Sequence, residues 1–153
     1  YKRQALRFAR AEPEDTEALR RLARASEAHW GYDEAFMENF DAGFNVTEDF
    51  IRRNPVYAAG ERGCPAAFWG IRQDRDAWEL EYFYVAEERL GRGLGKQMWE
   101  HMTGWCGKQE ICRIHFVTSP QAVGFYRKMG AVRDGETRSP VDGRPVPHFV
   151  YDV

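Results

Sequence analysis

Three glycines alternate in the segment RLGRGLGK, which runs from Arg89 to Lys96, at Gly91, Gly93 and Gly95. Glycine loses more conformational entropy on folding than any other residue, so this many in one turn indicates that something must approach the backbone. A glycine-rich turn before a helix presents main-chain N–H groups and the positive end of the helix dipole to an anion. The segment therefore indicates a site for a ligand that carries phosphate.

The spacing of this turn excludes two familiar phosphate loops. A Walker loop needs Ser or Thr after its Lys and a glycine five residues before its second glycine. Here Gln97 follows Lys96, and Leu90 stands five residues before Gly95. A dinucleotide turn needs a glycine three residues after Gly93, where the chain has Lys96. A glycine-rich helix entry that binds nothing is the alternative.

Two carboxylates, Glu79 and Glu81, lie in the aromatic segment AWELEYFYV, residues 77–85. Strand alternation predicts that they share one face with Phe83 and Val85, and that the other face carries Trp78, Leu80, Tyr82 and Tyr84. Two carboxylates on a strand this hydrophobic are unusual, because buried charge is costly without a partner. The alternative is that one or both lie at a solvated strand start or pair with an arginine.

Periodicity along the chain predicts one mixed α/β domain over residues 1–153. Helices are predicted at 12–30, 33–40, 47–53, 93–109 and 119–130, with Thr47 and Ser119 as N-caps. Strands are predicted at 4–11, 56–60, 66–72, 77–85, 111–117, 131–138 and 146–153. This order predicts a central mixed sheet of about six to seven strands, flanked by four to five helices.

Composition excludes several classes of protein. A net charge of -2 and a pI near 6.1 favour no nucleic-acid partner, and no apolar run reaches the roughly 20 residues of a membrane span. The three cysteines, Cys64, Cys106 and Cys112, follow no disulfide pattern, so we expect thiols in a reducing compartment, the cytoplasm. Cys112 and His115 are a poor metal pair, and no metal is expected.

The strand, turn and helix across residues 78–102 resemble the acetyl-CoA-binding core of the GNAT superfamily of N-acetyltransferases. That family's loop, Gln/Arg-x-x-Gly-x-Gly/Ala, falls on residues 90–95, with Leu90 in the place of Gln or Arg. The segment SPQAVGFYRKMGA, residues 119–131, resembles the family's later motif, N-x-x-A-x-x-F-Y-x-K-x-G-F. It matches at Ala122, Phe125, Tyr126, Lys128 and Gly130, and departs at Ser119 and Ala131.

The resemblance implies an enzyme that transfers an acetyl group from acetyl-CoA to a primary amine, a small molecule, by direct attack in a ternary complex. Donor-binding residues are then expected at Phe83, Tyr84, Val85, Leu90, Gly91, Arg92, Gly93, Leu94, Gly95, Lys96, Ser119, Ala122, Phe125, Tyr126 and Lys128. Because main-chain N–H groups hold most of a pyrophosphate, Leu90 implies a weakened charge contact, with more reliance on Arg92 and Lys96.

The resemblance also implies catalytic roles. Tyr126 would protonate the coenzyme A thiolate, and a main-chain N–H within residues 83–85 would bind the thioester oxygen. Glu79 falls at the position where several relatives carry their base, which acts directly or through water. Glu81 is the alternative base, or an anchor for a cationic acceptor. Trp30 and Tyr32 are candidates for the lining of the acceptor pocket.

Two other functions stay open at this point. One is a non-catalytic module on the same fold that binds acyl-CoA or regulates a partner. The other is an acyltransferase that uses a longer acyl-CoA, or that acts on protein lysines or N-termini. The predicted edge strands near the C-terminus also make a homodimer a reasonable expectation.

Overall fold

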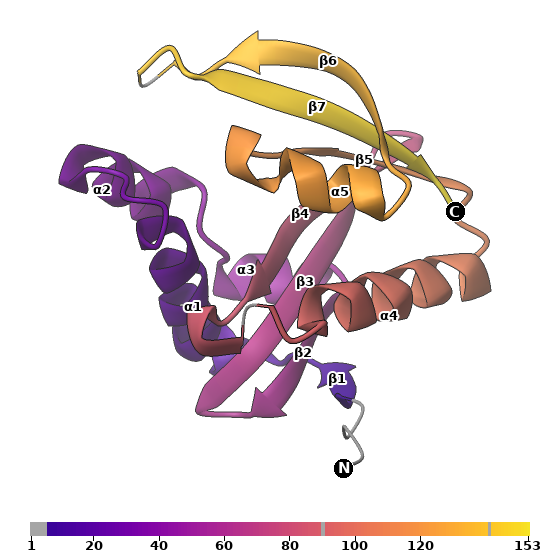
Figure 1. Cartoon of the computed structure of the whole chain (residues 1–153). Coiled ribbons are helices and arrows are strands. Elements are labelled where there is room, and N and C mark those ends of the chain that lie inside the picture. The colour runs from indigo at the N-terminus through magenta and orange to yellow at the C-terminus, as the bar shows by residue number, and fades with distance from the viewer. Residues whose placement is uncertain (1–5, 90, 141) are drawn as a thin grey trace.

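The computed structural model describes residues 6–89, 91–140 and 142–153 (Figure 1). Its strands are β1 (Phe8–Arg10), β2 (Val56–Glu61), β3 (Cys64–Asp74), β4 (Ala77–Val85), β5 (Arg113–Val117), β6 (Val132–Arg138) and β7 (Pro145–Asp152). They form one seven-stranded sheet in the order β1-β2-β3-β4-β5-β7-β6. Neighbouring strands are antiparallel except β4 and β5, which are parallel.

Helices connect these strands. They are α1 (Thr16–Ala28), α2 (Glu34–Gly43), α3 (Glu48–Arg53), α4 (Leu94–Lys108) and α5 (Val123–Lys128), with short 3₁₀ turns η1 (Pro13–Asp15), η2 (Glu87–Arg89) and η3 (Pro120–Ala122). Figure 1 shows α1 and α2 on one side of β3 and β4, α4 on the other, and α5 beneath the β6–β7 hairpin. This arrangement confirms the predicted mixed sheet flanked by helices.

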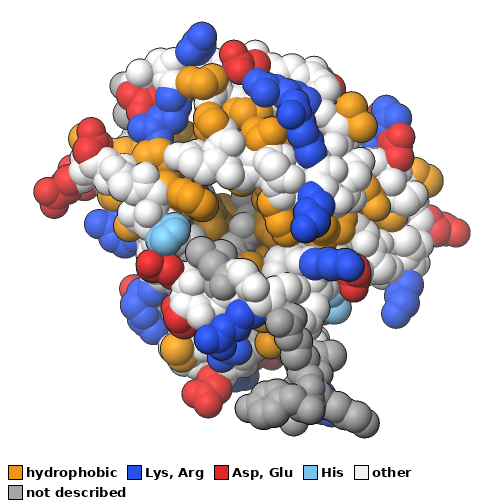
Figure 2. Space-filling view, viewed as in Figure 1, with side chains coloured by type: hydrophobic (Ala, Val, Ile, Leu, Met, Phe, Trp, Pro, Cys, Tyr) orange, Lys and Arg blue, Asp and Glu red, His pale blue; other side chains and the backbone are white. Residues whose placement is uncertain are grey.

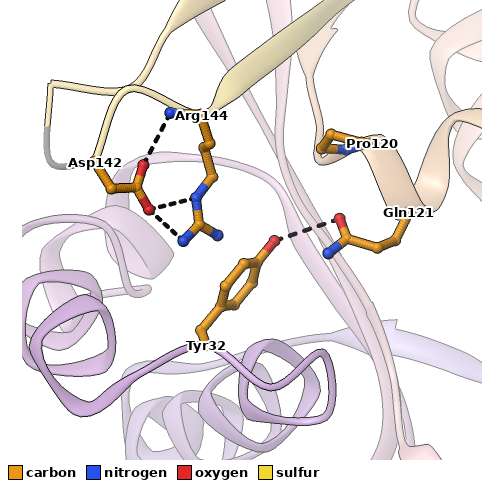
Figure 3. Close-up of a pocket in the computed structure, with 5 residues that line it drawn as sticks. All are labelled: Tyr32, Pro120, Gln121, Asp142 and Arg144. Carbon is orange, nitrogen blue, oxygen red and sulfur yellow. Dashed lines mark hydrogen bonds and ion pairs between the residues drawn. The ribbon is translucent and has the colours of Figure 1, made fainter.

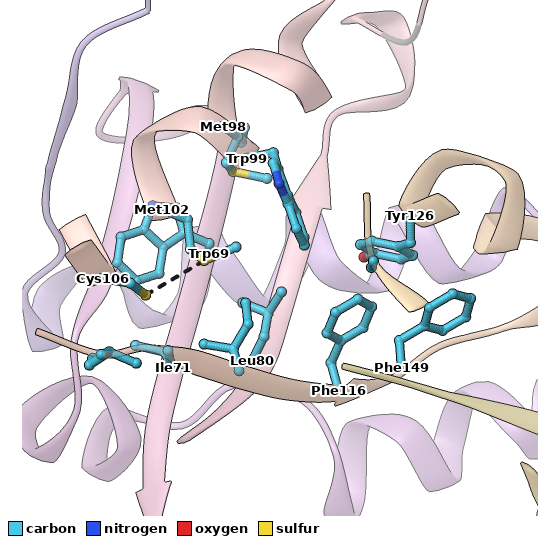
Figure 4. Packing of buried hydrophobic residues seen from close by; sticks show 14 residues of the cluster. Trp69, Ile71, Leu80, Met98, Trp99, Met102, Cys106, Phe116, Tyr126 and Phe149 are labelled. Atoms are coloured by element: carbon cyan, nitrogen blue, oxygen red, sulfur yellow. Dashed lines mark hydrogen bonds between the residues drawn. The ribbon is translucent and has the colours of Figure 1, made fainter. Parts of the chain in front are cut away.

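Two hydrophobic clusters cover the two faces of the sheet. One joins α4 and α5 to the sheet through Trp69, Met98 and Ile114 (Figure 4), and the other joins α1, α2 and α3 to it around Leu19 and Phe68. Successive residues of a strand point to opposite faces, so Phe68 and Trp69 enter different clusters, and each is fully buried. The central strand β3 is therefore apolar on both faces, as its run AAFWGI indicates.

Local capping explains where two of the helices begin. The Asp33 side chain accepts a hydrogen bond from Phe36 N at 2.8 Å at the start of α2. Thr47 Oγ1 accepts one from Phe50 N at 3.0 Å at the start of α3, which confirms the predicted cap. Ser119 makes no such side-chain bond, and the helix predicted over 119–130 is instead η3 followed by the short α5.

A β-bulge in β4 overturns the simple alternation predicted for that strand. Gly70 pairs with Tyr82 and Ile71 pairs with Leu80, so Glu81 is an extra residue on β4. Leu80 consequently packs in the α4 cluster, whereas Tyr82 packs in the α1 cluster. The prediction that Leu80 and Tyr82 share a face was wrong, and so was the prediction that Glu79 shares a face with Phe83 and Val85, which pack in the α4 cluster as Leu80 does. Periodicity alone cannot detect an inserted residue.

The same strand leaves its parallel neighbour early. The pairs between β4 and β5 are Trp78 with Ile114 and Glu79 with His115, whereas β3 stays paired with β4 as far as Val85. The carboxyl half of β4 therefore has a strand on one edge and an opening on the other. The candidate active site is built around this opening.

Candidate active site

The glycine turn forms the entrance to α4. Gly91 and Gly93 both have φ of +78°, a conformation that strongly favours glycine, and Gly93 is the N-cap of α4. Left-handed residues beside a helix start direct successive N–H groups toward one point, where an anion is stabilised. The local backbone is therefore suited to bind an anion. Leu90, the residue that departs from the family loop, lies outside the described residues.

Gly95 joins the turn to α5. A Cβ atom at this position would lie 2.9 Å from Cε1 of Phe125, which is closer than real Cβ contacts. Only glycine lets the first turn of α4 pack on this ring. The two sequence motifs, the glycine turn and the segment that contains Phe125, are thus in contact.

The opening beside β4 exposes main-chain groups in a defined pattern. Ala86 N donates to Ala66 O at 2.8 Å, so the register directs the N–H and C=O groups of Tyr84 and Tyr82 toward β3. The main-chain groups of Phe83 and Val85 then point to the other edge, into the opening. Consistent with this direction, the hydroxyl of Ser26 in α1 donates to Val85 O at 3.2 Å.

These positions refine the predicted binding segment 83–85. Phe83 and Val85 can offer main-chain groups to a ligand, whereas the Tyr84 side chain packs in the α1 cluster and its hydroxyl reaches Glu27. The space-filling view shows a hollow at the centre of this side of the molecule, rimmed by hydrophobic side chains, with Lys and Arg side chains gathered along one side (Figure 2). Arg92, Lys96 and Lys128 are exposed cations on the elements that flank the opening.

Tyr126 lies in the wall of the opening. Its ring is buried (7% exposed) and packs on Phe116, with ring centroids 4.6 Å apart (Figure 4). It also packs on Phe83, with ring centroids 5.9 Å apart. Burial raises the pKa of its hydroxyl well above the usual value, the Glu27 charge raises it further, and a hydrogen bond with Thr118 lowers it. The hydroxyl is therefore protonated throughout the neutral range, as a proton donor must be.

The predicted bases Glu79 and Glu81 share one arginine. Arg72 Nη2 contacts Glu79 Oε2 at 2.9 Å, and Arg72 Nε contacts Glu81 Oε1 at 2.7 Å. Burial raises the pKa of Glu79, the neighbouring Glu81 raises it further, and Arg72 lowers it. Glu79 stands opposite His115 at the last β4–β5 pair, where the opening begins.

A carboxylate that the sequence reasoning missed, Glu27, lies on the last turn of α1. The Tyr84 hydroxyl donates to Glu27 Oε1 at 2.8 Å. Burial raises the pKa of Glu27, while the Tyr84 hydrogen bond and Arg144 lower it. The sequence did contain a sign that the Glu27 side chain turns inward. Glu27 follows the buried Leu19 and Ala23 at four-residue spacing, so it lies on the same buried face of α1.

A cavity of about 390 Å³ adjoins this region, lined by Tyr32, Pro120, Gln121, Asp142 and Arg144 (Figure 3). The Arg144 guanidinium lies 4.1 Å from the centre of the Tyr32 ring and also pairs with Asp142. The Tyr32 hydroxyl donates to Gln121 Oε1 at 3.4 Å. Tyr32 thus lines a cavity on this side of the molecule.

The remaining predicted site residues lie at the surface or at the starts of helices. Trp30 is 46% exposed, packs its edge against His29 at 5.0 Å and is not part of the cavity wall. Ser119 and Ala122 are half-buried at the start of the segment that carries Tyr126, and Leu94 is buried at the start of α4. Arg144, Asp142 and Gln121 escaped the sequence reasoning, because a loop and a helix end far apart in sequence bring them to Tyr32.

No helix among the described residues has the length and apolar character that crossing a membrane requires. In the same residues, no group of three or more His, Cys, Asp or Glu side chains is placed to hold a metal ion.

Comparison with protein families identifies the class of this protein. The family described as the acetyltransferase (GNAT) family matches residues 16–131, most of the chain. The chain therefore belongs to the GNAT family, and it is an acyltransferase that takes acetyl-CoA as its donor. A comparison with curated proteins gave no match.

Solved structures share the fold at low sequence identity. The PaiA N-acetyltransferase from Thermoplasma acidophilum, solved with coenzyme A, is 19% identical with a TM-score of 0.75, over 98% of this chain and 100% of that chain. A GCN5-related N-acetyltransferase from Rhodopseudomonas palustris is 16% identical with a TM-score of 0.77, over 98% of this chain and 97% of that chain. These likenesses show the fold alone.

The contact between Gly95 and Phe125 yields a test. We expect Gly95→Ala to destabilise the protein by about 1–3 kcal/mol, because the new methyl group overpacks against the ring. Gly104→Ala in the same helix meets nothing within 4 Å, so it should stabilise the protein by about 0.5–1 kcal/mol. Urea unfolding measures both, and equal effects of the two changes would contradict the proposed contact.

Proposed function

We propose that this protein transfers an acetyl group from acetyl-CoA to the primary amine of a small molecule, by direct attack in a ternary complex. The observation that carries the proposal is the opening beside β4. Main-chain groups of Phe83 and Val85 line this opening. The glycine turn lies at one end of it, and Tyr126 forms part of its wall. A donor held by the turn would thus pass the strand edge and bring its thioester beside a protonated hydroxyl.

The donor site is assigned to the expected residues. The N–H groups of residues 91–95 and the start of α4 hold the pyrophosphate, with Arg92, Lys96 and Lys128 adding positive charge nearby. The edge of β4 binds the extended arm of the donor as an added strand would be bound, through main-chain groups. Leu90 supplies neither a charge nor a polar group to the pyrophosphate. The main-chain contacts therefore contribute a larger share of the affinity than they would if this residue were Gln or Arg.

Acetyl-CoA supplies the acetyl group in activated form, as a thioester. The Phe83 N–H is directed toward the opening and donates a hydrogen bond to the thioester oxygen, whose negative charge grows during attack. Tyr126 gives its proton to the sulfur as the C–S bond breaks. No covalent bond between the acetyl group and the protein is needed, and buried Cys106, whose pKa burial raises to about 11, is a poor nucleophile.

The acceptor amine must lose a proton before it attacks. An alkylammonium has a pKa of about 10.4, so deprotonation at neutral pH costs about 4–5 kcal/mol. Glu79 is the proposed base, acting directly or through a water molecule, and Glu81 is the alternative. Support comes from the place of Glu79 at the apex of the opening and from the burial that raises its pKa toward neutrality.

Three coarser proposals accompany this function. The domain is proposed to span residues 1–153, and the cytoplasm remains the proposed compartment, supported by three thiols that form no disulfide. A homodimer is proposed through β6, an exposed strand at the sheet edge. A non-catalytic acyl-CoA module, and an acyltransferase of protein lysines or N-termini, are the alternatives.

Replacement of Tyr126 tests the proposed proton donor. We expect Tyr126→Phe to lower kcat by about a hundredfold, because the general acid is lost, and to leave KM for acetyl-CoA within about twofold. Release of coenzyme A thiol in the presence of a panel of primary amines measures both constants. Tyr151→Phe is the matched control, since Tyr151 packs in the same aromatic cluster on another strand.

An unchanged kcat in the Tyr126 variant would refute the assignment. If the wild-type protein binds acetyl-CoA tightly but acetylates no amine or peptide in a broad panel, the non-catalytic module is favoured instead.

The pH dependence of kcat tests the proposed base. Because the pKa of Glu79 is raised, kcat at saturating amine should fall on the acid side at a higher pH than an ordinary glutamate would give. Glu79→Gln should lower kcat by about a hundredfold and flatten this acid limb. Asp76→Asn, in the exposed turn between β3 and β4, is the control. If Glu81→Gln removes the acid limb and Glu79→Gln keeps it, Glu81 is the base.

A further inference from the structure

Glu27 is a carboxylate that forms no ion pair with a Lys, Arg or His side chain among the described residues. The neighbouring carboxylates of this region contact cations, since Glu79 and Glu81 share Arg72 and Asp142 contacts Arg144. Glu27 instead accepts a hydrogen bond from the Tyr84 hydroxyl, and Arg144 acts on it only from beyond ion-pair distance. Its carboxylate therefore has no ion pair among the described residues, unlike those of Glu79, Glu81 and Asp142.

Such a carboxylate is costly to keep. Removal of an anion from water is unfavourable unless a partner offsets the cost, and one neutral hydroxyl offsets it in part. A ligand that brings a positive charge next to Glu27 would offset the remainder, whereas an anionic ligand would add repulsion. The site thus selects a cation.

The position of Glu27 links it to the reacting groups. Its charge raises the pKa of Tyr84 and of Tyr126, so it lies within electrostatic reach of both hydroxyls. The preceding residue, Ser26, donates to Val85 O at the edge of the opening and so pins the last turn of α1 to β4. A group bound to Glu27 is therefore close to the place assigned to the thioester.

We propose that Glu27 is the anchor of the acceptor site and that its carboxylate binds the ammonium group of a cationic primary amine. The inference rests on the proposed function and narrows the acceptor to amines that arrive protonated and carry no anionic group beside the nitrogen. Tyr84 is a positioning residue, because its hydroxyl holds the Glu27 carboxylate in place. The neighbouring cavity is lined by Tyr32 and by Arg144, whose guanidinium stacks on the rings of Tyr32 and Phe36 at 4.1 and 4.6 Å.

The charged and titratable groups around Glu27 set the expected pH dependence. They are Tyr84 from β4, Tyr126 from α5 and Arg144 from the β6–β7 loop. His29, at the end of the helix that carries Glu27, forms an ion pair with Glu87 and not with Glu27. Protonation of Glu27 abolishes its charge, so the amine binds more weakly as the pH falls through the Glu27 pKa. Because burial raises that pKa, the loss begins at a higher pH than for an exposed glutamate.

Binding to a non-reactive complex tests the anchor without turnover. Butylamine, putrescine and alaninamide are titrated by calorimetry into the protein saturated with coenzyme A, which has no acetyl group to transfer. We expect Glu27→Gln to weaken binding of these amines about tenfold or more and to remove its decline at acid pH. Glu17→Gln, an exposed change on the same helix, should leave binding unchanged. The melting temperature and the affinity for coenzyme A verify that each variant is folded.

Two results would overturn the proposal: equal binding of the amines by the Glu27→Gln variant, or no binding of any of them by the wild-type protein. In turnover, the anchor predicts a higher amine KM with kcat nearly unchanged, the opposite of the pattern expected for loss of a base. Amines that bind through Glu27 but are never acetylated would contradict the proposed function and leave the anchor supported.

Discussion

The site depends on one constraint: β5 stops pairing with β4 after Glu79 and His115, and the two strands diverge. In a sheet, the main-chain N–H and C=O groups of an inner strand normally form hydrogen bonds with a strand on each side. An edge without a partner strand leaves these groups free to bind another molecule. Here the carboxyl half of β4 is paired with β3 only, so Phe83 and Val85 turn their main-chain groups to an opening. A ligand with an extended, amide-containing arm can take the place that β5 vacates.

Packing on both faces of the sheet holds the opening apart. On one face, rings of Phe83, Phe116 and Tyr126 fill the space beneath α4 and α5, and Gly95 lets those helices meet. On the other face, Ser26 and Glu27 tie α1 to the edge of β4. Because the donor would complete these interactions only in the folded state, its binding should stabilise the fold by mass action.

Much of this arrangement could be predicted from local sequence. The glycine turn, the Thr47 cap and the bounds of β4 depend on residues within a few positions of one another, and each was found where it was expected. The bulge at Glu81 could not be found this way, because an inserted residue shows itself only in the pairing with β3.

The proposed acceptor side was the least predictable part for the same reason. Glu27 meets Tyr84 across 57 residues, and Arg144 reaches Tyr32 from a distant hairpin loop, so no local pattern records either contact. The four-residue spacing of Glu27 after Leu19 and Ala23 was the one local hint that its side chain turns inward.

Amide hydrogen exchange, measured residue by residue with and without acetyl-CoA, tests the central claim most directly. If the donor occupies the opening, the amides of Phe83, Val85 and the glycine turn should gain protection. The amides of Tyr82 and Tyr84, already bonded to β3, should change little. Protection that follows no such alternation along β4, or that appears only outside this strand and the turn, would contradict the account.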